Sequence, residues 1–225
     1  MITGETRLVG LLGDPVSGSL SPAMQNAAFA ALGLDWAYVP LPVRADALED
    51  AVHGLVALGF AGANVTTPHK LAVAKLVETR AQSVNTLVVR DGRVLGFSTD
   101  AAILSGLKTR RPAILGDGGS ATAFAQALAG AAHFSRRGDW PPDVDGADLV
   151  VNATSERDEV LVKLEPGQTL IDLPYPATAT ARAAREAGAR VLDGFDVLVA
   201  QGAAAFGLWT GLPAPIEVMR AAVGP

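Results

Sequence analysis

The stretch Ala113-Ile114-Leu115-Gly116-Asp117-Gly118-Gly119-Ser120-Ala121 joins an apolar run to a segment with helical character. The apolar run at 112–115 predicts a short buried strand, and residues from about 120 to 129 predict a helix. A glycine-rich turn in this context is typical of a dinucleotide-binding fold. Gly116 permits a tight turn, and Gly118 lets the backbone approach a pyrophosphate. The stretch therefore predicts a Rossmann-like unit, unless it is a plain connection between strand and helix.

The small residues of this turn are the first candidate cofactor-binding residues. The N-terminus of the following helix offers free N–H groups and a favourable dipole to phosphate groups. The candidates are Gly116, Gly118, Gly119, Ser120 and Ala121.

The end of the next predicted strand, at 131–135, indicates which dinucleotide is bound. An NAD site usually has an acidic residue there for the ribose hydroxyls, whereas an NADP site has arginine. Here the strand ends in Ser135-Arg136-Arg137, without a carboxylate. Guanidinium groups suit a 2′-phosphate, because they bind it through two parallel hydrogen bonds. The segment predicts NADP; the alternative is two solvated loop arginines.

Outward from this region, short β-rich runs alternate with helical stretches over the whole chain. This alternation predicts an α/β protein. Before residue 100 we expect strands at 7–12, 36–41 and 61–65, helices at 21–33, 46–58 and after Pro68, and a hairpin of 86–90 and 93–97 across Asp91-Gly92. After residue 100 we expect strands at 112–115, 131–135, 148–152, 169–172 and 190–192, and helices at 101–107, 120–129, 177–187, 195–209 and 215–223. Two sheets imply two lobes with a binding cleft between them.

Composition excludes several function classes. The 225 residues include no cysteine, which excludes a disulfide scaffold, a thiol nucleophile and thiolate metal ligands. The net charge of -5 argues against a nucleic-acid partner. No apolar run reaches the length of a membrane span, and Glu5 and Arg7 precede any apolar stretch, so we predict no membrane contact and no signal peptide. We expect a cytoplasmic protein, and we expect no metal site because the three histidines lack ligand spacing.

Two polar clusters lie near the ends of predicted strands. Asn64-Val65-Thr66-Thr67-Pro68-His69-Lys70 follows the strand at 61–65, at the edge where open α/β sheets bind ligands. A lysine in the first turn of a helix usually faces solvent, but a cation near a helix N-terminus is electrostatically unfavourable, which adds some weight to a functional role for Lys70. Ser19 and Ser21 could bind a carboxylate, or Ser21 could serve only as the N-cap of its helix.

Taken in order, the polar motifs of the chain resemble those of the shikimate dehydrogenase family. The resemblance extends over nearly the whole chain. The matching segments are Gly13-Asp14-Pro15, Ser19-Leu20-Ser21-Pro22, residues 64–70, Val84-Asn85-Thr86, Thr99-Asp100, residues 116–121, Ser135-Arg136, Val151-Asn152-Ala153-Thr154-Ser155, Asp172-Leu173-Pro174-Tyr175, Asp193-Gly194, Gln201 and Trp209-Thr210-Gly211.

The resemblance implies an NADP-dependent, reversible reduction of 3-dehydroshikimate to shikimate, a small-molecule substrate. In the matching positions, Lys70 would donate a proton to the carbonyl oxygen, and Asp100 would pair with Lys70. The resemblance implies that the substrate is bound by Ser19, Ser21, Thr66, Asn85, Tyr175 and Gln201. It places Ser135, Arg136, Arg137, Thr154 and Gly194 with the cofactor, beside the glycine-rich turn.

The resemblance also implies a division into domains. Residues 1–100 and 195–225 would form an α/β substrate-binding and catalytic domain, and residues 101–194 a Rossmann-like NADP domain. The stretch from Ser135 to Asn152 is too short for the usual helix-strand-helix, so we expect a reduced cofactor lobe. The alternatives are a dehydrogenase of quinate or another cyclohexane hydroxy acid, and a non-catalytic sensor that kept the fold. We expect a monomer or a homodimer.

Overall fold

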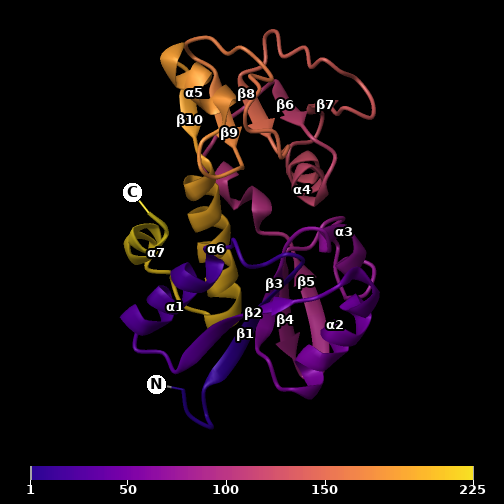
Figure 1. The fold of residues 1–225 in the computed structure, drawn as a ribbon, viewed down its shortest axis with the longest axis vertical. Coiled ribbons are helices and arrows are strands. Elements are labelled where there is room, and N and C mark those ends of the chain that lie inside the picture. Colours follow the sequence, from indigo (N-terminus) through magenta and orange to yellow (C-terminus); the bar gives the residue numbers. More distant parts are fainter. Residues whose placement is uncertain (1, 225) are drawn as a thin grey trace. The chain divides into compact units, whose positions relative to one another are not determined.

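The computed structural model describes residues 2–224. The chain divides into two compact units (Figure 1). The first comprises Met1–Thr99 and Val199–Pro225, and the second comprises Asp100–Leu198. Each unit has its own five-stranded sheet, so the α/β class with two sheets is confirmed.

The sheet of the first unit is mixed. Its order is β2-β1-β3-β4-β5, and its strands are β1 (Arg7–Gly13), β2 (Trp36–Pro42), β3 (Gly62–Val65), β4 (Thr86–Arg90) and β5 (Arg93–Phe97). β1 pairs in parallel with β2 and β3, whereas β4 is antiparallel to β3 and β5. Asp91 and Gly92 have φ of 52° and 73°, the positive values that a two-residue hairpin turn requires at both positions. The predicted hairpin is therefore confirmed, residue for residue.

Helices cover both faces of this sheet (Figure 1). The helices of the first unit are α1 (Ser21–Ala31), η1 (Ala45–Ala47), α2 (Leu48–Ala57), α3 (Lys70–Val73), the second part of α6 (Gly194–Thr210) and α7 (Ile216–Val223). On one face, Val52 and Leu55 of α2 pack into the core with Leu87 of β4. Elsewhere in the unit, Phe29 of α1 stacks on Phe206 of α6 at 5.4 Å. The predicted N-cap of α1 was wrong by one residue: Leu20 is the N-cap, and Ser21 is the first helical residue.

The sheet of the second unit is entirely parallel. Its order is β10-β9-β8-β6-β7, and its strands are β6 (Pro112–Leu115), β7 (Ala132–Phe134), β8 (Leu149–Asn152), β9 (Thr169–Asp172) and β10 (Arg190–Leu192). Its helices are η2 (Asp100–Leu104), α4 (Gly119–Ala127), α5 (Ala179–Glu186) and the start of α6. Residues 135–148, between β7 and β8, contain neither helix nor strand. A helix-strand-helix is missing there, as the length of this segment predicted.

Alternation along the strands builds two cores in the second unit. Leu115 and Val150 join Ala181 of α5 in one cluster. Their neighbours Ile114 and Val151 join Phe124 of α4 in another. Successive side chains of a strand point to opposite faces, so a run of apolar residues serves both cores. Because all strands of this sheet are parallel, their carboxyl ends lie at one common edge, and the glycine-rich turn after β6 lies at that edge.

Among the helices of residues 2–224, none combines the length and the apolar character that crossing a bilayer requires.

Candidate active site

The glycine-rich turn follows β6 and opens α4. Gly116 has φ of +117°, and a Cβ there would lie 2.8 Å from the Ala153 carbonyl oxygen, so only glycine is tolerated. Gly118 is the N-cap of α4, which has no side-chain cap hydrogen bond. Beyond Gly118 and its two chain neighbours, no heavy atom lies within 4 Å of the position that a Cβ of Gly118 would take. Ala121 is fully buried and lets the helix pack closely. The turn thus offers an uncovered helix N-terminus to an anion, which fits the pyrophosphate of a dinucleotide.

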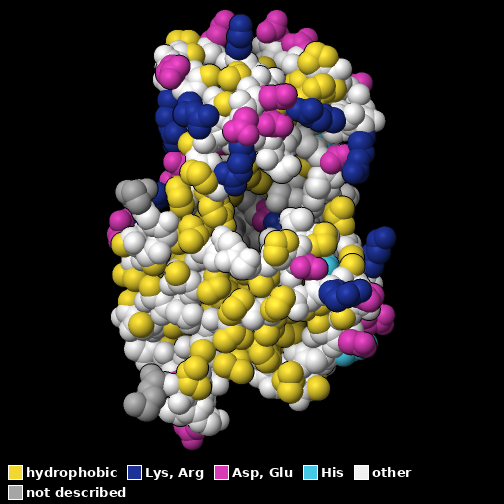
Figure 2. Space-filling view, in the orientation of Figure 1, with side chains coloured by type: hydrophobic (Ala, Val, Ile, Leu, Met, Phe, Trp, Pro, Cys, Tyr) yellow, Lys and Arg dark blue, Asp and Glu magenta, His cyan; other side chains and the backbone are white. Residues whose placement is uncertain are grey.

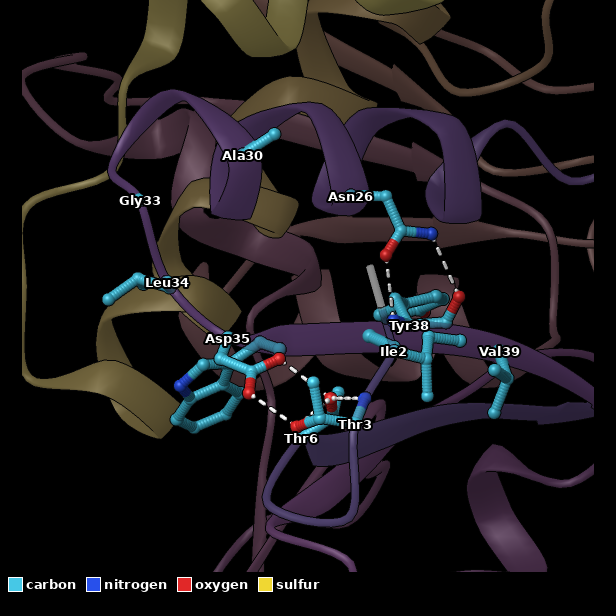
Figure 3. Close-up of a pocket in the computed structure, with 12 residues that line it drawn as sticks. Ile2, Thr3, Thr6, Asn26, Ala30, Gly33, Leu34, Asp35, Tyr38 and Val39 are labelled. Carbon is cyan, nitrogen blue, oxygen red and sulfur yellow. Dashed lines mark hydrogen bonds between the residues drawn. The ribbon is translucent and has the colours of Figure 1, made fainter.

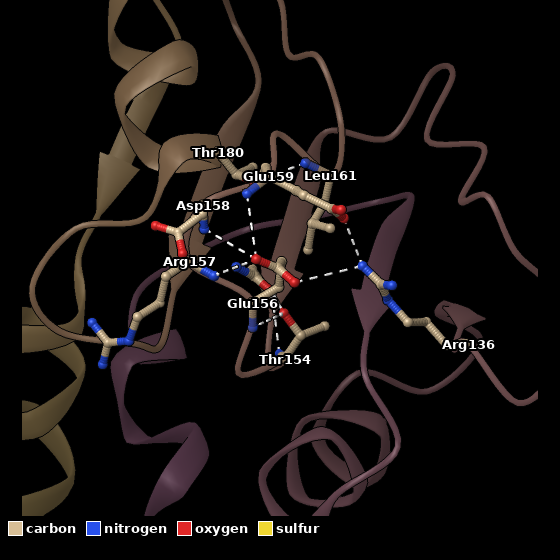
Figure 4. A network of polar contacts seen from close by, with 9 residues as sticks. Arg136, Thr154, Glu156, Arg157, Asp158, Glu159, Leu161 and Thr180 are labelled. Atoms are coloured by element: carbon tan, nitrogen blue, oxygen red, sulfur yellow. Dashed lines mark hydrogen bonds and ion pairs between the residues drawn. The ribbon is translucent and has the colours of Figure 1, made fainter.

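Both arginines after β7 are exposed and have carboxylate partners, and Figure 4 shows those of Arg136. The Arg136 guanidinium lies 2.7 Å from the Glu159 carboxylate and 3.6 Å from that of Glu156. It also lies over the Trp140 ring, 5.3 Å from the centroid. Arg137 pairs with Asp117 of the glycine-rich turn at 3.4 Å. The last pair brings the turn and the arginine segment together, as one cofactor site requires. Ser135 is the first residue after β7 and half-buried.

Thr154 follows β8 beside the glycine-rich turn. Its hydroxyl donates to Asn152 Oδ1 at 2.7 Å, and accepts a hydrogen bond from the Glu156 N–H at 3.2 Å. Since the Ala153 carbonyl contacts Gly116, the end of β8 and the end of β6 meet at the same edge. The structure therefore brings Thr154 together with the turn and with the partner of Arg136.

Asp172 at the end of β9 is a buried carboxylate with a structural role. Its Oδ1 accepts hydrogen bonds from Asn152 Nδ2 at 2.7 Å and from the Thr178 hydroxyl at 3.1 Å. Burial raises the pKa of Asp172 above its ordinary value, and these hydrogen bonds oppose the shift. Asp172 ties the ends of β8 and β9 to the start of α5.

Gly194 and Tyr175 lie close together at the start of α6. A Cβ on Gly194 would lie 2.7 Å from the Leu173 carbonyl oxygen, so this close backbone approach requires glycine. The half-buried Tyr175 ring stacks on Phe195 at 5.6 Å. Both candidates belong to the second unit. Asp100 is 7% exposed and opens η2 in the same unit.

Lys70 is half-buried and is the first residue of α3 in the first unit. The preceding residue, His69, is buried, and its Nε2 lies 2.6 Å from the Val43 carbonyl oxygen. The Lys70 carbonyl accepts the Val84 N–H at 3.0 Å, which places Lys70 beside the segment that carries Asn85. Thr66 is joined to β1 because its N–H donates to the Leu12 carbonyl at 2.8 Å.

Asn85 is the centre of a buried network of amides and hydroxyls. Its Nδ2 donates to Thr99 Oγ1 at 2.9 Å and to Gln201 Oε1 at 3.3 Å. Its Oδ1 accepts the Thr99 N–H at 2.7 Å. Asn64 of β3 extends the network, since its Nδ2 donates to the Asn85 carbonyl at 2.9 Å. Two predicted substrate-binding residues, Asn85 and Gln201, are thus brought together although they are far apart in sequence.

The remaining substrate candidates, Ser19 and Ser21, lie at the start of α1. The Ser19 hydroxyl accepts the Ser21 N–H at 3.2 Å and so shapes the turn that opens the helix. Ser21 is 7% exposed. Pro22 follows it at the second helical position, where its missing N–H leaves no bond unmade.

Sequence reasoning assigned no role to several residues that form these sites. Tyr38 donates its hydroxyl to Asn64 at 2.9 Å, and Thr86 and Thr99 connect Asn64 to Asn85. Glu156 and Glu159 were missed as partners of Arg136. A polar residue in a strand, such as Asn64 or Thr86, is a usable signal for a buried network. No sequence signal joins Arg136 to glutamates about twenty positions further on.

A cavity of about 560 Å³ lies at the β2 edge of the first unit, away from the candidate residues (Figure 3). Its lining includes none of the predicted site residues. Asp35 accepts hydrogen bonds there from the Thr3 and Thr6 hydroxyls at 3.0 and 2.6 Å. Asn26 of α1 uses its side-chain amide twice: Nδ2 donates to the Tyr38 carbonyl at 2.9 Å, and Oδ1 accepts the Tyr38 N–H at 2.8 Å. Elsewhere in residues 2–224, no group of three His, Cys, Asp or Glu side chains has the arrangement that a metal ion requires.

Two profiles of one family match the chain, for the most part within the first unit. Residues 11–87 match the profile described as the shikimate dehydrogenase substrate binding domain. Residues 194–223 match the profile of the shikimate 5'-dehydrogenase C-terminal domain.

Similar proteins extend this match over the full chain. The shikimate dehydrogenase (NADP(+)) of Anaeromyxobacter sp. (strain Fw109-5) is 41% identical, and the match covers 99% of this chain and 98% of that protein. The alignment runs over 272 positions against 225 residues here, so this relative carries segments that the chain lacks.

Solved structures agree with the sequence comparison. A crystal structure of shikimate dehydrogenase in complex with NADP+ has a TM-score of 0.90 and 32% identity, covering 99% of this chain and 96% of that one. The shikimate 5-dehydrogenase of Listeria monocytogenes, in complex with shikimate and NAD, has a TM-score of 0.87 and 28% identity, covering 98% and 97%. The chain belongs to the shikimate dehydrogenase family.

Proposed function

We propose that this protein catalyses the reversible, NADP-dependent reduction of 3-dehydroshikimate to shikimate. The observation that carries the proposal is the full-length similarity to a named shikimate dehydrogenase (NADP(+)), at 41% identity. The candidate residues support it, because the chain retains Lys70 and Asp100 together with the buried Asn85 and Gln201. A sensor that had lost catalysis would need neither charged residue.

The first unit would bind the substrate. The Ser19 and Ser21 hydroxyls would hold its carboxylate, with the ordered turn at the start of α1 fixing their positions. Thr66, Asn85 and Gln201 would bind ring hydroxyls. Because Asn85 and Gln201 are already hydrogen-bonded to each other, their amides have little freedom to lose when the substrate binds. Tyr175 of the second unit would contact the same substrate.

The second unit would bind NADP. The glycine-rich turn would receive the pyrophosphate on the N-terminus of α4, and Arg136, with Arg137, would receive the 2′-phosphate. Ser135 and Thr154 would complete this site at the edge of the sheet, and Gly194 would let the nicotinamide end approach. The bound cofactor supplies hydride chemistry.

Proton transfer would be the task of Lys70. Reduction of the ketone adds a hydride to the carbonyl carbon and a proton to its oxygen. The Lys70 ammonium Nζ would give that proton, and in the reverse direction the amine would take it back. The Asp100 carboxylate would orient Lys70 and stabilise its charged form. General acid catalysis of this kind contributes about a hundredfold to ten-thousandfold in rate.

An activity assay tests the proposal. Purified protein is mixed with shikimate or quinate and with NADP or NAD, and the formation of reduced nicotinamide is followed. We expect the highest kcat/KM with shikimate and NADP; a preference for quinate would favour the paralogue, and no reduction by any pair would overturn the enzymatic function.

A matched pair of lysine variants tests the role of Lys70. Lys70→Ala is expected to lower kcat about a thousandfold. Lys75→Ala removes an exposed lysine of the same segment and should leave kcat within about twofold. Equal activity of Lys70→Ala and wild type would exclude the proton-transfer role.

The monomeric or homodimeric state and the cytoplasmic location stay predictions from the sequence.

A further inference from the structure

Arg136 already has anionic partners within its own unit. The carboxylates of Glu159 and Glu156 lie 2.7 and 3.6 Å from its guanidinium. Figure 4 shows both glutamates on the same loop, pointing toward Arg136 from across the edge of the sheet. The Arg136 side chain is 58% exposed, so an external anion can reach it. Any such anion meets an arginine whose charge is already balanced.

Glu156 is fixed in place by the backbone. Its Oε1 accepts the N–H groups of Arg157, Asp158 and Glu159 at 2.9, 3.0 and 3.3 Å, which leaves Oε2 facing Arg136. The hydrogen bond from the Asp158 N–H, followed by those from Glu159 and Arg157, holds the pKa of Glu156 below its ordinary value. Glu156 is therefore negatively charged at neutral pH. Glu159 reaches Arg136 with a side chain that is 65% exposed and can swing away.

We propose that Glu156 and Glu159 are specificity-determining residues that weaken the preference for NADP over NAD by competing for Arg136. This inference rests on the proposed function, since it assigns the 2′-phosphate to Arg136. A phosphate that binds Nη2 of the guanidinium must displace the Glu159 carboxylate, which lies 2.7 Å from that nitrogen. It then stays next to the Glu156 carboxylate, which cannot withdraw. NAD carries no charge at this position and meets neither obstacle.

Arg137, the second arginine of the segment, also has a carboxylate partner, but only one among residues 2–224. Arg137 is 86% exposed and pairs with Asp117 at 3.4 Å. Neither guanidinium of the segment is thus held ready for a phosphate without a carboxylate beside it. Exposed pairs of this kind contribute about 0.2–1 kcal/mol each, or about 1.4-fold to fivefold in an equilibrium constant. The competition therefore modulates binding of the 2′-phosphate and does not abolish it.

The test measures binding of two nucleotides that differ in the 2′-phosphate. The probes are adenosine 2′,5′-bisphosphate and adenosine 5′-monophosphate, titrated calorimetrically into the full-length protein. Glu159→Gln and Glu156→Gln keep the side-chain shape, and the amide introduced by Glu156→Gln retains an oxygen for the three backbone N–H groups. We expect the 2′,5′-bisphosphate to bind about threefold tighter to Glu159→Gln and about fivefold to tenfold tighter to the double variant. Binding of the 5′-monophosphate should stay within about twofold.

Glu186→Gln is the matched control, because it removes the same charge from an exposed position of α5 in the same unit. An equal gain in Glu186→Gln would show a general charge effect and overturn the proposal. Unchanged or weaker binding in the double variant would also overturn it, and weaker binding would mean that the glutamates position Arg136. If wild type shows no gain in affinity from the 2′-phosphate, and Arg136→Ala changes nothing, the proposed NADP site fails as well. A wild type that prefers the 2′,5′-bisphosphate, with silent glutamate variants, would refute this inference alone.

Discussion

The first unit holds candidate substrate residues in a buried network of uncharged side chains, whereas the candidate cofactor residues of the second unit include arginines in exposed charged pairs. Asn85 is 3% exposed, and the Arg136 side chain is 58% exposed. On the face drawn in Figure 2, Lys, Arg, Asp and Glu side chains are frequent over the second unit, whereas hydrophobic side chains cover much of the first. A buried uncharged network fixes geometry, because each bond that is lost leaves a desolvated partner. Exposed ion pairs are weak and screened, so a charged ligand can rearrange them.

The largest effect is expected from breaking the network of the first unit. Asn64 is 4% exposed and accepts from Tyr38 while donating to Asn85 and Thr86. Asn64→Ala would remove three buried hydrogen bonds and lower the free energy of unfolding by about 3 kcal/mol. Urea unfolding measures this loss. Thr3→Ala, which removes an exposed hydroxyl, should change it by less than about 0.5 kcal/mol. Equal stability of the two variants would contradict the rigidity assigned to the network.

A smaller effect is expected from Arg136→Ala in the second unit. We expect affinity for adenosine 2′,5′-bisphosphate to fall about tenfold, since one charge-assisted contact is lost. Affinity for the 5′-monophosphate should change by less than about twofold, and the free energy of unfolding by less than about 0.5 kcal/mol. Calorimetric titration and urea unfolding give both values. A large loss of stability would remove the contrast between the units, and an equal loss for both nucleotides would contradict the assignment of the 2′-phosphate.

Asp172→Asn tests the comparison between the two units from the other side, because Asp172 is a buried ionisable group within the unit whose arginine pairs are exposed. Burial raises the folded-state pKa of Asp172, so the folded state binds its proton more readily than the unfolded state. The free energy of unfolding therefore falls as pH rises from about 3.9, the unfolded-state pKa, through the raised value. The Asp172→Asn variant does not titrate. Its side-chain NH2 group would face the Thr178 N–H, which now donates to Asp172 Oδ2, so one hydrogen bond is lost and the free energy of unfolding at neutral pH falls by about 1 kcal/mol.

The check is urea unfolding of both proteins over a pH series. The advantage of wild type over Asp172→Asn should be greatest in acid and shrink as pH rises through the window. Asp139→Asn, an exposed substitution of the same kind, serves as the control. A constant difference at every pH would show that Asp172 does not titrate as its burial predicts.

The smallest effect is expected from Arg137→Ala. Its side chain is 86% exposed and its pair with Asp117 is long, at 3.4 Å. Affinity for the 2′,5′-bisphosphate should fall by less than about threefold. The same titration measures it, and a loss as large as that of Arg136→Ala would make the two arginines equal partners.

Local pattern was sufficient to predict most of the fold. Five strands have the predicted bounds: β4, β5, β6, β9 and β10. Their bounds are set by apolar patterning and by glycine-containing turns, and both signals are contained in a few consecutive residues. The helix expected after Pro68 is a single turn at Lys70–Val73. A residue from that segment, Glu78, instead bridges to Leu95 of β5, a contact between distant segments that no local pattern contains.

The site was predicted less completely than the fold. Motif order selected Lys70, Asn85 and Gln201 as candidates, but it did not indicate the hydrogen bond between Tyr38 and Asn64, the residue that donates to the Asn85 carbonyl. That bond joins β2 to β3 across the sheet, so it depends on strand order. The pairing of Arg136 with Glu159 likewise depends on how two loops meet at one edge. Charge counts along the sequence do not contain this information.

Asn26 has a consequence for the assembly of the first sheet. β2 is an edge strand, and its outward N–H and C=O groups at Tyr38 are both occupied by the Asn26 amide. Pro40 and Pro42 further along β2 have no N–H to offer. A strand from another chain would therefore find no continuous row of free backbone N–H and C=O groups along β2 with which to pair. The molecule thereby protects itself against edge-to-edge aggregation with one amide and two prolines.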